Sequence, residues 1–180
     1  MLIQLILVPA LLSTSTVSWN FEGQALKQFS SAISAYTHTH RAAVQQLDPA
    51  LPCRGPEAIT IRRDELAAYI RAARPDAHEG DIFTPSVAFV LRQRLRDAIP
   101  RLMPLPEDEA WQPAEQTERS TLLAVNEFLP WQHGTHPYHP LLSVLPALPE
   151  ELEYRLSGND LVLLDIDARV VVDILRDAIP

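Results

Sequence analysis

The spacing of apolar residues predicts three amphipathic helices in the N-terminal part of the chain. Over residues 24–47, apolar side chains and one histidine recur three and four positions apart, which places them on one face of a helix. A second helix is expected over 57–74. A third is expected over 85–100, because Thr84 is a suitable capping residue and Pro85 suits the first helical position. Three heptads without a regular charge pattern favour a small bundle over a coiled coil.

Each predicted helix has an apolar stripe that we expect to be buried. The stripe of the first helix comprises Leu26, Phe29, Ile33, Tyr36, His40, Ala43 and Leu47. The stripe of the second comprises Ile59, Leu66, Ile70 and Ala73. The stripe of the third comprises Val87, Leu91, Leu95 and Ala98.

The C-terminal residues follow a different pattern, which predicts a three-strand antiparallel meander. Strands are expected over 152–156, 161–164 and 170–175, because short runs rich in apolar and β-branched residues are separated by turn signals. A helix over 170–178 is the alternative for the last element. Between the helices and the strands, nine of the 16 prolines fall within 100–149, which favours extended or irregular structure.

These elements predict an α+β fold in which residues 21–180 form one domain. The domain is expected to consist of an N-terminal three-helix core over 21–100, a Pro-rich connecting segment over 101–149 and the β meander over 150–180. The connecting segment is expected to wrap over the core, with one helix over 115–128.

The composition of residues 1–20 predicts a signal peptide. The first 21 residues carry no charged side chain, and an apolar run from Leu2 to Leu12 precedes the small polar residues 13–18. The run is shorter than the ~20 residues that span a membrane. The sequence therefore predicts export to the periplasm or the extracellular space, with an uncleaved N-terminal anchor or a buried element as alternatives.

Charge and cysteine content exclude several classes of protein. A net charge of -8 does not suit nucleic-acid binding, which needs a basic face. Cys53 is the only cysteine, so no intramolecular disulfide forms; a buried inert thiol is expected, with a free or dimerising thiol as the alternative. Residues 54–101 hold nine Arg and seven acids, whereas 102–180 hold 14 acids and four Arg. The basic helices either dock on the acidic C-terminal half or present unrelated solvated faces.

Three histidines in the connecting segment form the candidate metal site. His133, His136 and His139 lie in a predicted loop, and three imidazoles suit a zinc, nickel or copper ion. An extended backbone would hold successive rings about 9 Å apart, so a plain surface loop or weak binding remain alternatives. His40 is expected to be a core histidine with a backbone partner, and His38 is expected to be exposed.

Other side chains give no catalytic motif. Asp165 and Asp167 share a face only if strand geometry continues through them, and a turn with a solvated strand edge is the expected explanation. The chain lacks Gly-x-Ser-x-Gly and Gly-x-x-x-x-Gly-Lys, and Ser-x-x-Lys is absent after the signal region. We therefore expect no catalytic residues and no enzymatic activity.

Two stretches resemble a known group of proteins. Gly80-Asp-Ile-Phe-Thr-Pro85 and the stretch over 148–165, which reads LPEELEYRLSGNDLVLLD, resemble a family of uncharacterised bacterial proteins that are predicted to be exported. The resemblance implies export from a bacterium and implies no activity. The C-terminal stretch is also similar to the tail of periplasmic nickel and cobalt homeostasis proteins, in which a Gly-Asn/Asp-Asp turn joins two short strands.

Together these patterns predict a small exported binding or interaction protein of the bacterial envelope. Its partner is expected to be an envelope protein or a small ligand, and the membrane is expected to be contacted only through the N-terminal segment. The alternative is a periplasmic metal-binding protein that uses the histidine-containing loop. A hydrolase is a third class, and no motif supports it.

Overall fold

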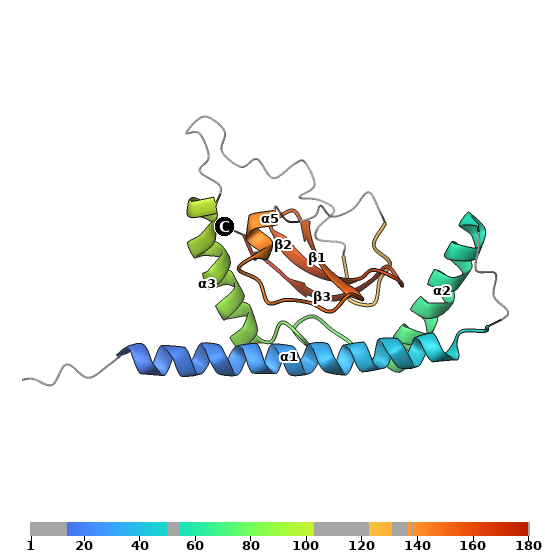
Figure 1. The fold of residues 1–180 in the computed structure, drawn as a ribbon, viewed down its shortest axis with the longest axis horizontal. Helices are drawn as coiled ribbons and strands as arrows, with labels where there is room; N and C mark the ends of the chain where they lie inside the picture. Colours follow the sequence, from blue (N-terminus) through green and yellow to red (C-terminus); the bar gives the residue numbers. More distant parts are fainter. Residues whose placement is uncertain (1–13, 50–54, 103–122, 131–136, 138, 180) are drawn as a thin grey trace, which may run out of the picture.

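A long helix forms the base of the molecule, and two shorter helices rise from it. In this computed structural model, α1 runs over Thr14–Gln46, α2 over Pro56–Ala73 and α3 over Pro85–Leu102. Both α2 and α3 contact α1, and the sheet lies between them (Figure 1). The structure describes residues 14–49, 55–102, 123–130, 137 and 139–179.

The strands of the described chain form one antiparallel sheet in the order β1-β2-β3. They comprise β1 over Leu152–Ser157, β2 over Asp160–Asp165 and β3 over Val170–Leu175. The predicted meander is therefore confirmed, and the helical alternative for the last element is wrong. A short helix, α5 over His139–Leu142, packs against α3.

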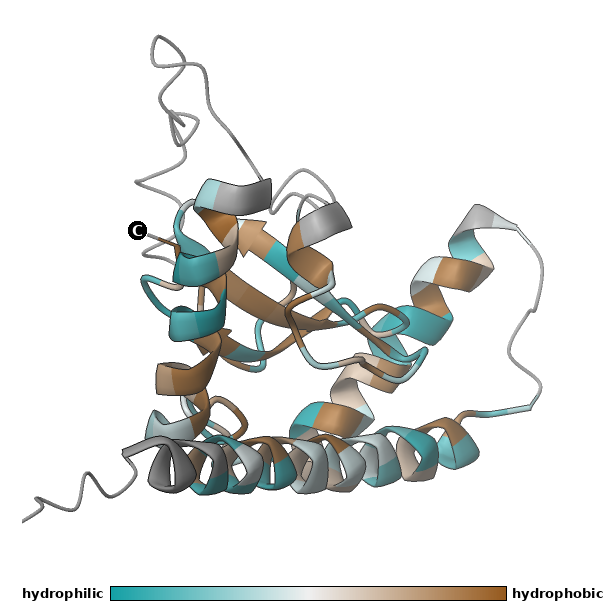
Figure 2. Ribbon diagram, turned by 60° about the vertical axis from the view of Figure 1, so that its left-hand side comes forward, coloured by the Kyte–Doolittle hydropathy of each residue, from teal (hydrophilic) through white to brown (hydrophobic). Residues whose placement is uncertain are grey.

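Both faces of the sheet are buried, which explains why β2 and β3 are almost continuously apolar (Figure 2). One face joins the main core with α1, α2 and α3, through Leu161, Leu163 and Val172 among others. The opposite face forms a second cluster with residues of the connecting segment. That cluster comprises Leu123, Leu129, Val162, Leu164, Val171 and Ile174.

The connecting segment packs over the sheet through residues 123–130, which are not helical, whereas α5 forms a short helix later in the same segment. Residues 123–128, the described part of the helix expected over 115–128, follow the free edge of β3. Asn126 N donates to Val171 O, Val171 N donates to Glu127 O, and Phe128 forms an isolated antiparallel bridge with Val170. The backbone of this segment therefore forms its hydrogen bonds with the free edge of β3 instead of forming helical ones.

Two helices differ in length from their predictions. Helix α1 begins at Thr14, ten residues before the predicted start, so it enters the segment expected to be a signal peptide. Helix α3 continues through Pro100 and ends at Leu102, whereas Pro100 was expected to end it. Proline in the last turn removes a single helical hydrogen bond, so the backbone is able to continue for two more residues. No helix within the described ranges is long and apolar enough to cross a membrane.

Only half of the apolar stripe predicted for α2 is buried. Leu66 and Ile70 are buried as predicted, but Ile59 is 67% exposed and Ala73 is also exposed. The first turns of α2 stand away from the sheet (Figure 1), in agreement with the exposure of Ile59. The stripe of α3 is buried at all four predicted positions.

The basic helices do dock on the C-terminal half, but they bind carbonyl groups rather than acids. Arg71 Nε donates to Asn126 O at 2.7 Å, and Arg74 Nη2 donates to Val172 O at 3.3 Å. Arg92 Nη2 donates to the carbonyl of Arg176 at 2.7 Å. The guanidinium groups therefore satisfy backbone acceptors of the connecting segment, of β3 and of the residues after β3.

Candidate functional site

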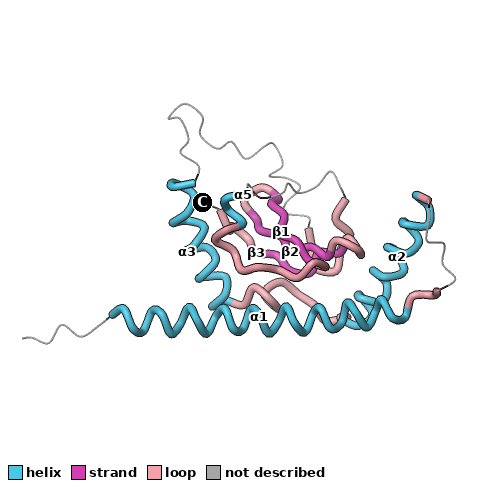
Figure 3. Tube along the Cα trace, viewed as in Figure 1, coloured by secondary structure: helices cyan, strands magenta, loops and turns pink. Residues whose placement is uncertain are grey.

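An open groove of about 630 Å³ runs along α1 and is the candidate binding site. Its floor contains Leu26, Phe29 and Ile33, and the loop that precedes β1 forms the opposite wall with Pro146 and Pro149. Figure 3 shows this arrangement of loop segments between α1 and the strands. We call this feature the α1 groove. It offers an apolar floor to a ligand.

The rim that α1 contributes to the groove is polar. Ser30, Ser34 and His38 line it at four-residue intervals, and all three side chains are exposed. Residues four apart lie on the same side of a helix, so these groups form a row along the groove. The exposure of His38 agrees with the prediction from sequence.

An ion pair lies at one end of the α1 groove. Arg41 lines the groove, and its Nε and Nη2 atoms both lie 2.9 Å from Glu151 Oε1. Burial raises the pKa of Glu151, but hydrogen bonds from its own backbone amide and from Arg41, with the charge of Arg41, outweigh this and lower the pKa below its usual value. Glu151 Oε2 is buried and has no hydrogen-bond partner among the described residues.

Beside the groove, a buried polar cluster joins α1 to the end of β2. Asp165 is completely buried, and its Oδ2 atom accepts hydrogen bonds from Tyr36 Oη at 2.7 Å and from His40 Nδ1 at 2.6 Å. Its Oδ1 atom accepts from Ala168 N at 2.8 Å. On the other side of the imidazole ring, His40 Nε2 lies 3.5 Å from Asp167 Oδ2. We call Tyr36, His40, Asp165 and Asp167 the His40 cluster.

The electrostatics of the His40 cluster favour the protonated imidazole. Burial by itself lowers the pKa of His40, but the hydrogen bond to Asp165 and the charges of Asp165, Asp167 and Glu151 outweigh it and raise the pKa above its usual value. Burial also raises the pKa of Asp167, with the charge of Asp165 adding to the effect. Burial and the hydrogen bond to Asp165 raise the pKa of Tyr36, so its hydroxyl remains a donor.

A second buried acid, Asp173 on β3, holds the loop between α2 and α3. Its Oδ1 atom accepts from Gly80 N and Ile174 N at 2.8 Å, and its Oδ2 atom accepts from Ile82 N and Phe83 N at 2.7 Å. Gly80 has a φ of 91°, a conformation that glycine adopts without a steric penalty. Burial raises the pKa of Asp173, and the four amide donors counteract part of that effect. We call Asp173 and these four amides the Asp173 clasp.

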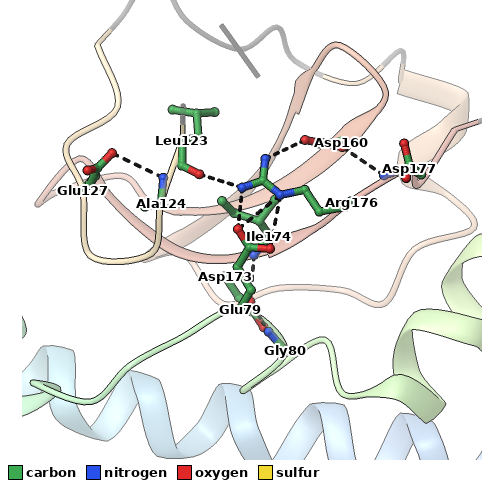
Figure 4. Close-up of polar contacts among 10 residues, drawn as sticks. All are labelled: Glu79, Gly80, Leu123, Ala124, Glu127, Asp160, Asp173, Ile174, Arg176 and Asp177. Carbon is green, nitrogen blue, oxygen red and sulfur yellow. Dashed lines mark hydrogen bonds and ion pairs between the residues drawn. The ribbon is translucent and has the colours of Figure 1, made fainter. Parts of the chain in front are cut away.

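Next to the Asp173 clasp, Arg176 connects three further segments (Figure 4). Its guanidinium pairs with Glu79, lies 2.9 Å from Asp160 Oδ2 and donates to Leu123 O at 2.7 Å. The hydrogen bond to Glu79 is the main cause that raises the pKa of Arg176. Asp177 N donates to Asp160 Oδ1 at 2.9 Å, which fixes the chain after β3. These contacts connect the end of β3 to the start of β2, to the loop between α2 and α3 and to the connecting segment.

The predicted metal site at His133, His136 and His139 falls on side chains outside the described structure. His133 and His136 lie outside the described residues, and His139 begins α5 with a side chain that the structure does not describe. Elsewhere in the described ranges, no group of three or more histidine, cysteine, aspartate or glutamate side chains is placed to hold a metal ion.

The buried acids are the site residues that sequence reasoning misjudged. Asp165 was expected at a solvated strand edge, yet it is 0% exposed because α1 covers the end of β2. His40 is buried as expected, but its partner is the carboxylate of Asp165 rather than the backbone. Asp173 carried a usable signal, because a lone acid within the apolar run 170–175 must find several hydrogen-bond donors if both faces of its strand are buried.

Comparisons with family models, with curated proteins and with solved structures found no match to this chain. The described structure therefore stands by itself as an α+β fold with an open groove along α1. The resemblance to exported bacterial proteins stays a prediction.

Proposed function

We propose that this chain is an exported binding protein of the bacterial envelope, and that the α1 groove binds an extended segment of a partner protein. The observation that carries the proposal is the groove itself, which combines an apolar floor with a regular polar rim. Ligand sites in proteins are typically concave, mostly apolar and equipped with a few placed polar groups.

The length of the groove suits a short peptide. Its α1 wall extends from Leu26 to Arg41, and a helix rises 1.5 Å per residue, so the groove is about 22 Å long. An extended chain advances about 3.3 Å per residue, so roughly six or seven residues match this length.

The spacing of the rim also suits an extended backbone. Ser30, Ser34 and His38 follow one another at about 6 Å along the helix axis. Alternate residues of an extended chain point the same way and lie about 6.6 Å apart. Each rim side chain is therefore placed to pair with every second peptide unit, while the intervening side chains face the floor at Phe29 and Ile33.

Blocking the groove is expected to abolish peptide binding. Selection from a displayed library of random seven-residue peptides on the protein should enrich sequences with apolar residues at alternate positions. In Ser34→Trp the indole fills the groove, so the affinity for a selected peptide should fall at least tenfold in a fluorescence anisotropy titration.

Ser31→Trp is the matched control, because Ser31 is exposed on the same helix but does not line the groove. Its affinity for the selected peptide should equal that of the unmodified chain. Failure to enrich any peptide, or an equal loss in both variants, would contradict binding at the α1 groove.

Export is expected to depend on the apolar run at the N-terminus. A charge within a signal peptide's apolar region opposes its insertion by roughly 2.5–3.5 kcal/mol, so Leu7→Arg should leave the protein in the cytoplasm. Gln4→Ala, which adds no charge, should be exported normally. Cell fractionation with sequencing of the amino terminus measures both, and an unmodified chain found in the cytoplasm with Met1 intact would refute export.

A further inference from the structure

The imidazole of His40 lies between two carboxylates that belong to different parts of the fold. Asp165 at the end of β2 binds Nδ1 at 2.6 Å, and Asp167 in the β2–β3 turn lies 3.5 Å from Nε2. His40 itself is 3% exposed, whereas the Asp167 side chain is 59% exposed. One side of the ring is therefore held in a dry contact, and the other side faces an acid that water reaches.

We propose that His40 is a pH-sensitive switch that attaches the β2–β3 turn to α1. The protonated ring donates from both nitrogens and holds Asp165 and Asp167 together. The neutral ring keeps its proton on Nδ1, where Asp165 accepts it at short distance, and presents a lone pair from Nε2 to Asp167. Two groups that only accept hydrogen bonds repel each other, so the turn loses this attachment to α1.

The surrounding charges favour the attached state. On α1, Tyr36 donates to Asp165 and Arg41 neutralises Glu151. After α2, the guanidinium of Arg74 lies 5.0 Å from the centre of the Tyr36 ring, about one helical turn before His40 on α1. Before β1, Glu151 adds negative charge beside His40, and Glu150 adds negative charge beside Asp167. The groups nearest His40 are thus predominantly acidic, which favours its proton.

The sign of the pH dependence follows from the pKa of His40, which is raised in the folded protein. The stability that the protonated ring contributes is complete below the pKa of an unfolded histidine, about 6.5. It is lost as the pH rises through the higher pKa of the folded state. The turn is therefore attached below the pKa of His40 in the folded protein and released above it.

The switch is connected to the α1 groove by the backbone. Ile166 N in the turn donates to Glu151 O at 3.1 Å, and the side chain of Glu151 binds Arg41 at the end of the groove. Release of the turn therefore removes one support from this end. The switch does not depend on what the groove binds, so it is tested separately from the proposed function.

Nuclear magnetic resonance of the full chain tests the switch without a ligand. The His40 imidazole should titrate above pH 6.5, and the backbone amide of Ile166 should change its chemical shift with the same midpoint. In Asp167→Asn, the midpoint of His40 should fall by about one pH unit, the size expected for removing a unit charge 3.5 Å away in water-like surroundings. The Ile166 amide should then no longer follow the imidazole.

Asp97→Asn is the matched control, because Asp97 is exposed on α3 and should leave the His40 midpoint unchanged. A wild-type midpoint at or below 6.5 would overturn the proposal. So would an Ile166 amide that is unaffected by the titration of His40, or an equal midpoint in Asp167→Asn and the unmodified chain. Since the wild-type titration needs no substitution, these outcomes remain decisive if a variant folds poorly.

Discussion

Asp173→Ala is expected to destabilise the fold by about 3–5 kcal/mol, because several amides lose their acceptor and each buried donor left unsatisfied costs about 1–3 kcal/mol. The four amides of the Asp173 clasp would lose their acceptor, and three of them belong to the loop between α2 and α3. That loop also stacks Phe83 on Phe29 of α1. Its release would therefore loosen the contact between the sheet and the base helix.

Urea unfolding followed by far-ultraviolet circular dichroism measures this loss. Asp173→Asn keeps the side-chain volume but replaces one acceptor oxygen with a donor, so destabilisation in both variants excludes a cavity as the cause. Asp97→Ala is exposed on α3 and should stay within about 0.5 kcal/mol of the unmodified chain. An equal stability of Asp173→Ala and Asp97→Ala would show that the clasp contributes nothing.

Local pattern was sufficient to predict the elements. Helices α1, α2 and α3 and the three strands all appear in the predicted order, and apart from the start of α1 their bounds lie within two residues of the predicted ones. These signals are local, because amphipathic spacing and turn chemistry act over a few residues. The α+β fold follows from the order in which the elements occur along the chain.

Features that depend on distant contacts could not be predicted. Residues 123–128 follow the free edge of β3, and only the assembled sheet creates that edge. Periodicity within residues 115–128 therefore predicted a helix, because the sequence pattern alone does not reveal the strand edge with which this segment pairs.

The two buried acids explain what the resemblance motifs do in the fold. Residues 80–85 supply three amides to Asp173, and the stretch over 148–165 ends in Asp165, which binds α1. Both motifs therefore attach helical elements to the sheet. This role is structural, and it fits motifs from which no catalytic residue was inferred.

Burial, rather than apolar character alone, is expected to decide the cost of truncating helical side chains. Ile33 and Leu91 were both predicted to face the core, and they are 7% and 0% exposed. Changing either one to alanine removes buried methyl and methylene groups and leaves a cavity, so each variant should lose about 2–5 kcal/mol of unfolding free energy. Leu91 should lie toward the upper end because it is 0% exposed within the main core.

Ile59→Ala is the matched control for these variants, since it makes the same chemical change as Ile33→Ala within another helix. Sequence pattern placed Ile59 on the apolar stripe of α2, but the side chain is 67% exposed. Alanine has a slightly higher helix propensity than isoleucine, so this variant should stay within about 0.5 kcal/mol of the unmodified chain. Urea unfolding of all three variants compares them directly. A loss below 0.5 kcal/mol at both Ile33 and Leu91 would mean that the helical faces are wrongly assigned. A large loss at Ile59 would mean that the first turns of α2 pack against a surface absent from the described fold.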